Sequence, residues 1–484
     1  MPSTATVTSS PESKNAELPS AEFIEGIRAI AREHFDSAFL PQEELPRQKW
    51  ELLTRAGVLL PALPTEFGGR DSHLEMCRVI EAIAEWNLPL AMYAKIISAV
   101  ALRPIVMRAS EPTRTEVLSE FGTGAPLICG FASTEPGCGS NMSAMRTTFE
   151  PGPAGYRLRG HKHWQGFSTT ADWWLVSAKN DDNGREYGYF VLRREEGFTT
   201  TERYTPMGMR LLDYGLNEID ATVPAHRRLD AANHDLSAMP ELLTPPRSMM
   251  ASIAAGFLRR ISRETRAYAE RRPLGRGTLA DIGFVRYRIR AVESSATICR
   301  ALAHHVETRM DLKSDMTESF PVSLALKTVA TERMVSAANH YVQIAGGEGY
   351  RTESPTNIAA QAFLDTRVFT IFDGTNDLLS QQLTHHCQKL AAGDPLSSFL
   401  ATWELTAPAV GAGIDLTFLD GPLAQEHLVL AGRAIAYAIA HTLVRQWSQR
   451  TTDVTDQARI AMAFLTADVN AIAVEFNLLA QRIL

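Results

Sequence analysis

Apolar side chains recur at helical spacing over the residues that follow position 20. Phe23, Ile27 and Ala31 fall on one such face. The run from Leu88 to Val106 is apolar on nearly all sides, which predicts a helix that its surroundings bury. We therefore predict a helical domain over residues 21–126. The Ser-, Thr- and Pro-rich composition before it predicts a disordered tail over 1–20.

The pattern changes at Pro126, where short apolar runs between turns replace the helical period. Runs of this length and spacing are typical of a small β-barrel or β-sandwich. We therefore predict a middle β domain over residues 127–240. Its strands are expected at 127–132, 156–159, 173–177, 187–192 and 218–223.

Long helical stretches return beyond residue 241 and carry small side chains on one face, a pattern typical of a helical bundle. We predict this bundle over 241–392 and an additional helical extension over 393–484. The predicted fold class is α+β and mostly α, with a helical domain, a β domain, a bundle and an extension in that order. The long helices are expected at 249–270, 279–312, 321–345, 424–447 and 456–484.

Composition and charge narrow the classes of function. The chain has 484 residues, enough for several domains, and 45% of them are hydrophobic. A net charge of -7 without a basic block gives no electrostatic footprint for nucleic acid. The five cysteines are scattered and form no CxxC pair, which fits a reducing compartment and argues against a disulfide framework.

Targeting and metal-binding signals are also weak. No segment comes near the roughly 18 continuous apolar residues of a membrane span, and the tail lacks the features of a signal or transit peptide. We therefore expect a cytoplasmic protein with no membrane span. The closely spaced histidines lack carboxylate partners, so we predict no metal site.

One acidic residue stands out in the segment from Arg367 to Leu379, where an apolar run leads to Asp373 and then to a Gly-Thr-Asn turn. Ile371 and Phe372 predict partly apolar surroundings for Asp373, and a carboxylate in such surroundings can serve as a general base. Alternatively, Asp373 simply caps the helix that follows, because Asp is a favoured N-cap residue.

A second candidate is the loop Ser133-Thr-Glu-Pro-Gly-Cys-Gly-Ser-Asn141, which follows the first predicted strand. Its glycines let the backbone approach a ligand closely, and its hydroxyl groups can hydrogen-bond phosphate or a ring carbonyl. A glycine-rich loop alone is weak evidence. It becomes specific together with the segment Trp164–Trp173 and the Asp373 turn.

With these segments the chain resembles the acyl-CoA dehydrogenase superfamily over about residues 20–390. The extension is not explained by the basic family pattern. The stretches that carry the resemblance are Phe131–Ser140, Gly160–Trp173 continuing through Pro206–Met209 to Pro224, Tyr268–Gly275, and Gln343–Tyr350 with Ile371–Asn376.

The resemblance implies FAD, bound between the β domain and the bundle, with Asp373 as catalytic base and Arg247 near the active site. It also implies a homodimer or homotetramer, because the family's flavin site borrows residues across subunits. The implied FAD contacts are Thr134, Ser140, Trp164, Gly166, Thr375 and Asn376, with Arg271, Gln343 and Gly347 reaching the FAD of a neighbouring subunit.

Several positions depart from the family pattern. Asp373 stands where most members have a glutamate, so the base is one methylene shorter. Gly166 replaces a threonine that bonds flavin N5, so a backbone group or a water has to serve there. Pro246 stands where a few members carry an alternative glutamate base, so no second candidate base is found.

The resemblance implies an acyl-thioester dehydrogenase that removes an α-proton and passes the β-hydride to the flavin. The substrate would be an acyl-CoA or an acyl-carrier protein, and the electron acceptor an electron-transferring flavoprotein or oxygen. The rival hypothesis is an oxygen-using flavoenzyme of the same fold, such as a nitroalkane oxidase, because those relatives use Asp as base. A non-catalytic flavoprotein is a third possibility, which the flavin loop and Asp373 argue against.

Overall fold

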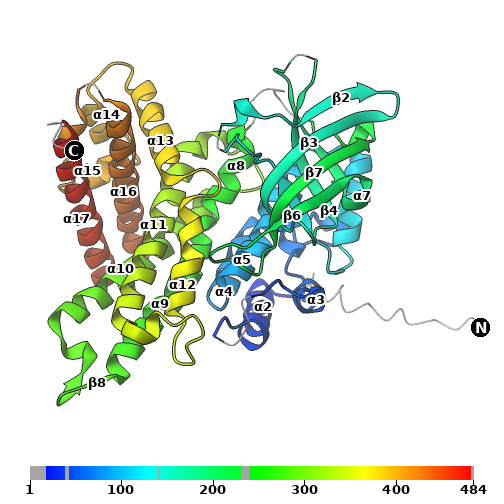
Figure 1. Cartoon of the computed structure of the whole chain (residues 1–484). Coiled ribbons are helices and arrows are strands. Elements are labelled where there is room, and N and C mark those ends of the chain that lie inside the picture. The colour runs from blue at the N-terminus through cyan, green and yellow to red at the C-terminus, as the bar shows by residue number, and fades with distance from the viewer. Residues whose placement is uncertain are drawn as a thin grey trace, which may run out of the picture. The chain divides into compact units, whose positions relative to one another are not determined.

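The structure is a computed structural model whose described residues form two compact units (Figure 1). The first unit comprises 1–36, 40–83 and 89–242, and the second comprises 37–39, 84–88 and 243–484. Most of the expected tail, 1–20, lies outside the described part. The described residues are 18–38, 43–139, 141–182, 184–230, 239–421 and 423–480.

Helices form the N-terminal part of the first unit. The first of them, α2, buries Phe23, Ile27 and Ala31, which is the face that their spacing predicts. Trp50 on α3 is fully buried and donates its indole N–H to the Leu127 carbonyl, which ties this helix to the start of the sheet. The bounds are α2 Ser20–His34, α3 Arg47–Arg55, α4 His73–Ala84 and α7 Glu111–Phe121.

The apolar run at 88–106 is helical and buried, as predicted, but its middle is a π-helix. The Arg103 N–H donates to the Ser98 carbonyl, five residues back, at the point where Pro104 follows without an N–H of its own. Helical segments of the π type are rare in proteins overall, but those that occur are often found at functional sites. The run consists of α5 Leu88–Lys95, η3 Ile96–Leu102 and α6 Arg103–Arg108.

A curled sheet follows, and seven strands of it lie in the described residues (Figure 1). Their order is β1-β4-β2-β3-β7-β6, and β5 pairs with β4. The five predicted strands are confirmed, whereas β2 and β6 were not predicted, because a proline and a run of threonines mask their period. The bounds are β1 Cys129–Ala132, β2 Thr148–Gly152, β3 Gly155–Gly166, β4 Trp173–Asn180, β5 Tyr187–Arg193, β6 Phe198–Tyr204 and β7 Tyr214–Val223.

Long helices build the second unit, and the predicted ones are found within a few residues of their expected bounds. Shorter elements connect them, among them a two-stranded hairpin of β8 Pro273–Leu274 and β9 Gly277–Thr278. The helices are α8 Met239–Ser248, α9 Met250–Arg271, α10 Gly283–Arg309, α11 Phe320–Ala345, α12 Ala359–Thr366, α13 Asn376–Ala391, α14 Leu396–Thr402, α15 Ala407–Val410, α16 Gln425–Arg450 and α17 Thr455–Ala480.

The C-terminal extension packs into the bundle and belongs to the same compact unit. Gly432 of α16 lies so close to α13 that an added Cβ would sit 1.9 Å from the Ser380 carbonyl oxygen. The buried Arg333 of α11 donates to the Asp468 carboxylate on α17 at 2.7 Å and to the Tyr437 hydroxyl on α16 at 2.9 Å. Close backbone contact therefore holds α16 against the bundle, and a part-buried ion pair holds α17.

Three helical stretches are long and apolar enough to cross a membrane by length and composition: Leu88–Arg108, Gln425–Arg450 and Thr455–Leu479. By this criterion the prediction that no segment comes near a membrane span is wrong. Small residues and few charges keep the mean hydropathy of these helices high, although none of them is an unbroken apolar run. In each of the first two stretches 83% of the apolar window is buried, so that apolar surface takes part in core packing. In the third it is only 22% buried.

Substitution of Gly432 by Ala should destabilise the second unit by about 1–3 kcal/mol, because the methyl group cannot fit against Ser380 without moving α16 from α13. Gly26→Ala is the matched control: Gly26 is also helical, and an added Cβ meets nothing within 4 Å. It should stabilise by up to about 1 kcal/mol through helix propensity. Denaturant midpoints followed by circular dichroism measure both, and an unchanged midpoint for Gly432→Ala would contradict the packing.

Candidate active site

Asp373 lies in a tight turn between the 3-10 helix η11 (Arg367–Thr370) and α13. Its φ is 55°, in the left-handed region, and Gly374 follows with a φ of 94°. The N-cap of α13 is Thr375, whose hydroxyl accepts the Leu378 N–H at 3.3 Å. The alternative that Asp373 caps this helix is therefore wrong. Left-handed backbone at a non-glycine residue costs free energy and is concentrated at functional sites.

Arg247 of α8 fixes the first half of this turn. Its Nε donates to the Asp373 carbonyl oxygen at 2.9 Å, and its side chain is 5% exposed. Burial lowers the pKa of Arg247 to about 10, although the negative charge of Asp373 acts in the opposite direction. The family resemblance implies that Arg247 lies near the active site, and in the structure Arg247 contacts the backbone of Asp373.

Lys327 of α11 fixes the second half of the turn and is fully buried. Its Nζ donates to the Gly374 carbonyl at 2.9 Å and to Oδ1 of Asn376 at 2.8 Å. Nδ2 of Asn376 in turn donates to the Thr331 hydroxyl at 3.1 Å. The Asn376 side chain is thus engaged inside the bundle, and its implied FAD contact stays a prediction, as does that of Thr375.

The apolar surroundings predicted for Asp373 are uneven. The Phe372 ring is partly buried against Phe369, with ring centroids 4.9 Å apart. Ile371 on the other side of the segment is 48% exposed. Aromatic packing therefore holds one flank of the turn, and the other flank presents an aliphatic side chain on the surface of the chain.

In the first unit, a buried ion pair anchors the glycine-rich loop. Nζ of Lys162 on β3 donates to the Glu135 carboxylate at 2.7 Å and to the Ser133 carbonyl at 3.1 Å, and both charged side chains are at most 2% exposed. Burial alone would raise the pKa of Glu135, but Lys162 and hydrogen bonds lower it below its ordinary value. A network of charge-assisted hydrogen bonds therefore holds the loop backbone in place.

Thr134 sits at the start of this loop, half-buried, and its carbonyl accepts the His163 N–H at 2.9 Å and the Gln165 side chain at 3.0 Å. The structure thereby brings Thr134 to the strand end that carries Trp164 and Gly166. Ser140, the other predicted residue of the loop, lies outside the described residues.

Trp164 occupies a β-bulge in the pairing of β3 with β7, where the register shifts between His163 and Gln165. Its φ is 62°, and 53% of its side chain is exposed. Tyr204 lies beside it with ring centroids 4.8 Å apart. Bulges re-aim side chains and are common next to active sites. Here the bulge presents a flat indole surface near the C-terminal end of β3.

Gly166 ends β3, and a Cβ added there would lie 3.0 Å from Leu212 and 3.6 Å from Ile96 of the π-helix. A larger side chain at 166 would thus require Leu212 to shift. Nearby, Asp213 accepts the hydroxyl groups of Thr169 at 2.7 Å and Thr170 at 2.8 Å, so it fixes the turn that follows the strand.

The residues expected to reach a neighbouring subunit meet at one end of the bundle. Arg271 ends α9, while Gln343 and Gly347 lie where α11 passes into η10 (Gly346–Gly349). The Tyr268 hydroxyl donates to the Ala345 carbonyl at 2.9 Å and joins the two helix ends. All three predicted residues are exposed on the single chain, and their FAD contact stays a prediction.

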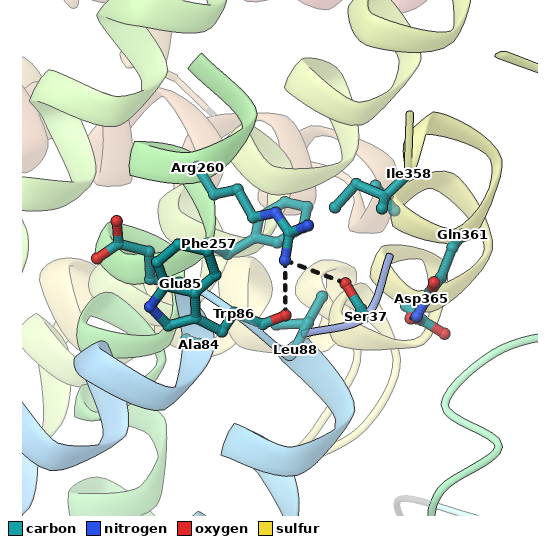
Figure 2. A pocket seen from close by; sticks show the side chains of 11 residues that line it. Ser37, Ala84, Glu85, Trp86, Leu88, Phe257, Arg260, Ile358, Gln361 and Asp365 are labelled. Carbon is teal, nitrogen blue, oxygen red and sulfur yellow. Dashed lines mark hydrogen bonds between the residues drawn. The ribbon is translucent and has the colours of Figure 1, made fainter. Parts of the chain in front are cut away.

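A small pocket in the second unit contains none of the predicted site residues (Figure 2). Arg260 of α9 reaches across it and donates to the Trp86 carbonyl at 2.7 Å and to the Ser37 hydroxyl at 3.2 Å. Gln361 and Asp365 of α12 line its other side (Figure 2). Arg260 connects separate segments of the chain to α9. We therefore interpret the pocket as a structural junction.

Sequence reasoning missed Lys162 and Lys327, which are fully buried, as Lys95 also is, and which anchor the candidate loops. Lys162 alternates inward on its strand, and Lys327 interrupts the apolar helix from Pro321 to Ala345. A lone lysine in an otherwise buried element is a signal, since lysine is almost never fully buried without a polar partner.

Comparisons with known proteins show what the chain is similar to. Human mitochondrial very long-chain specific acyl-CoA dehydrogenase is 23% identical over 350 residues, 70% of this chain and 52% of that protein. The chain thus spans about half the length of this relative. The caffeyl-CoA reductase-Etf complex subunit CarC of Acetobacterium woodii is 26% identical over 342 residues, 69% of this chain and 88% of its own length.

A solved acyl-CoA dehydrogenase of Bacillus anthracis, complexed with FAD, has a TM-score of 0.76 at 19% identity. It covers 98% of this chain and 89% of its own, so the extension has a counterpart in that fold. The N-terminal, middle and C-terminal domain models of acyl-CoA dehydrogenases match residues 20–125, 130–221 and 236–387. These three matches take in most of the chain in the expected order, and the chain belongs to the acyl-CoA dehydrogenase family.

Proposed function

We propose that this protein is an FAD-dependent acyl-thioester dehydrogenase that introduces an α,β double bond into an acyl-CoA or an acyl group on a carrier protein. The observation that carries the proposal is the carboxylate of Asp373 on a left-handed turn that two buried cations hold by its backbone. Family membership supports the reaction class, and the retained acid argues against a non-catalytic flavoprotein.

The residues of the first unit fit a flavin cofactor. Trp164 offers an exposed indole face for packing against an aromatic ring system. Gly137 and Gly139 of the loop have left-handed φ values, and an added Cβ would meet nothing within 4 Å at either residue. That loop leaves room for a ligand to approach the backbone. The FAD in the Bacillus anthracis relative supports the same assignment.

In the proposed reaction Asp373 removes the proton from the carbon next to the thioester carbonyl and retains it. Arg247 and Lys327 hold the Asp373 and Gly374 carbonyls, so the carboxylate starts from a fixed backbone position. When bound, FAD supplies the acceptor for the hydride from the β-carbon. Because Asp is shorter than Glu, a rigid turn matters more here for reach.

The electron acceptor and the assembly are part of the proposal. Membership of an Etf complex by the Acetobacterium woodii relative supports an electron-transferring flavoprotein as acceptor. Oxygen is the alternative, since the aspartate at position 373 also occurs in nitroalkane-oxidase-like relatives. The exposed group of Arg271, Gln343 and Gly347 supports a homodimer or homotetramer in which it meets the cofactor of another subunit.

Asp373→Asn should slow anaerobic reduction of the bound flavin by an acyl-CoA about 10²- to 10⁴-fold, because the amide cannot take the α-proton. Asp377→Asn is the matched control, since Asp377 is an exposed acid in the first turn of α13. Stopped-flow bleaching of the flavin across a panel of acyl thioesters measures both. Reduction of Asp373→Asn at the wild-type rate would refute the base assignment.

The oxygen-using alternative predicts a different result with the same protein. A dehydrogenase should be bleached by an acyl thioester without oxygen and should form peroxide only slowly in air. Rapid aerobic peroxide formation with a nitroalkane, abolished by Asp373→Asn, would favour the oxidase and contradict the proposed substrate class. An amperometric peroxide electrode distinguishes the two.

Lys327→Met should lower the rate of flavin reduction with little change in substrate KM, because the Gly374 carbonyl and the Asn376 side chain lose their cation. The buried acceptors left unpaired should also cost about 1–3 kcal/mol of stability. Lys389→Met, at an exposed position near the end of α13, is the control. A variant that unfolds more easily but reduces flavin as fast as wild type would show that Lys327 does not position the base.

A further inference from the structure

The helix that follows the candidate base, α13, is held along one face by the extension. Asn376, Ser380 and Thr384 share this face at intervals of four residues, and all three are buried. The backbone of Ser380 touches Gly432 of α16, and the Thr384 hydroxyl donates to the Leu428 carbonyl at 2.7 Å. The partners on α16 run in the opposite direction, so the two helices are antiparallel. Later residues of α16 therefore lie toward the N-terminus of α13 and the turn before it.

Tyr437 is the residue of α16 that continues these contacts toward the turn. Its hydroxyl donates to Oε2 of Glu332 at 2.7 Å and accepts from Nη2 of Arg333 at 2.9 Å. Burial raises the pKa of the Tyr437 hydroxyl, which therefore stays protonated and donates. Asp468 of α17 holds Arg333 from the other side, at 2.7 Å. One buried hydroxyl group of the extension is thus fixed between two charged side chains of α11.

Glu332 links Tyr437 to the first residue of α13. Its second carboxylate oxygen, Oε1, accepts from Nδ2 of Asn376 at 3.5 Å and lies 3.5 Å from Nε of Arg433 on α16. The contact with Asn376 is long for a hydrogen bond. The full negative charge of Glu332 nevertheless attracts the amide N–H groups at this distance, because both side chains are shielded from water. Two residues of α16 therefore hold the carboxylate that faces Asn376.

Asn376 is the residue through which these contacts reach the turn. An asparagine amide accepts hydrogen bonds at one end and donates at the other. At its acceptor end Oδ1 binds Nζ of Lys327 at 2.8 Å, and the same Nζ donates to the Gly374 carbonyl at 2.9 Å. An ammonium group at one end and the Glu332 carboxylate at the other fix the orientation of the amide. A displacement of Glu332 would therefore disturb Lys327 and the backbone next to Asp373.

We propose that Tyr437 of the extension is a positioning residue for the candidate base, acting through Glu332 and Asn376 on the turn that carries Asp373. The inference rests on the proposed function for the role of Asp373, whereas the contacts that connect the extension to the turn do not. It gives the extension a part in the reaction, although the matched C-terminal domain model ends at residue 387. Because the Tyr437 hydroxyl holds the turn only through other side chains, its loss should change the rate of reaction more than substrate binding.

Hydrogen exchange measured by mass spectrometry tests the link without any substrate. Tyr437→Phe in the full FAD-loaded chain keeps the ring and removes only the hydroxyl. The backbone amides of residues 371–379 should then exchange about 2- to 30-fold faster, the range expected for coupled positions. Thr384→Val is the matched control, because it removes a hydroxyl contact between the same two helices about 12 Å from Asn376. It should leave exchange at 371–379 unchanged. Wild-type exchange there in Tyr437→Phe would overturn the proposal.

Stopped-flow reduction of the flavin by an acyl-CoA tests the consequence for the reaction. Tyr437→Phe should lower the limiting rate by about 2- to 30-fold with KM and FAD content retained, and Thr384→Val should keep the wild-type rate. Glu332→Gln should also slow reduction, and adding Tyr437→Phe to it should have little further effect, because residues of one network are not additive.

A wild-type rate in Tyr437→Phe, or additive effects of the two substitutions, would overturn the proposal. Where Tyr437→Phe does not fold, as judged by circular dichroism, Glu332→Gln carries both the exchange and the rate measurement with the same expected results. If no acyl thioester reduces the wild-type flavin while exchange at 371–379 still rises in Tyr437→Phe, the proposed function fails and the link between the extension and the turn is confirmed.

Discussion

The candidate base depends on two buried cations that hold a strained turn by its backbone. Arg247 binds the Asp373 carbonyl and Lys327 binds the next one, at Gly374. Neither cation comes from the segment that carries the base: one lies on α8 and the other on α11. A left-handed residue followed by a left-handed glycine relaxes without such restraints. Contacts from the folded bundle therefore stabilise the conformation of the turn.

In the β domain, too, a buried cation holds a loop. Lys162 reaches from β3 into the loop that follows β1 and holds the Ser133 carbonyl and the Glu135 carboxylate. Burying an ammonium group is unfavourable unless several acceptors surround it. Lys162 meets this condition mainly with oxygen atoms of the glycine-rich loop, together with the Ser177 hydroxyl on β4, and Lys327 with oxygen atoms of Gly374 and Asn376. Burial of each charge is therefore coupled to the order of the loop or turn that it contacts.

The sequence predicted the architecture well because periodicity reports burial along each element. It identified the five strands with clear apolar runs and missed β2 and β6, whose Pro151 and threonine run hide the alternation. Asp373 was singled out from its local pattern, and Arg247 was found through the resemblance. The anchoring by Lys162 and Lys327 was not found, since a buried lysine is defined by partners far away in sequence. The left-handed turn likewise depends on contacts that no local pattern encodes.

Because of the close contact between Gly432 and Ser380, α13 supports both the candidate active site and the extension. Its N-terminus follows the turn that carries Asp373, and its side supports α16 of the extension. A truncation near residue 393 would remove α16 and expose the face of α13 that contacts it. The extension is therefore not a removable appendage, and a shortened chain would be a poor substitute for the whole protein in kinetic or crystallographic work.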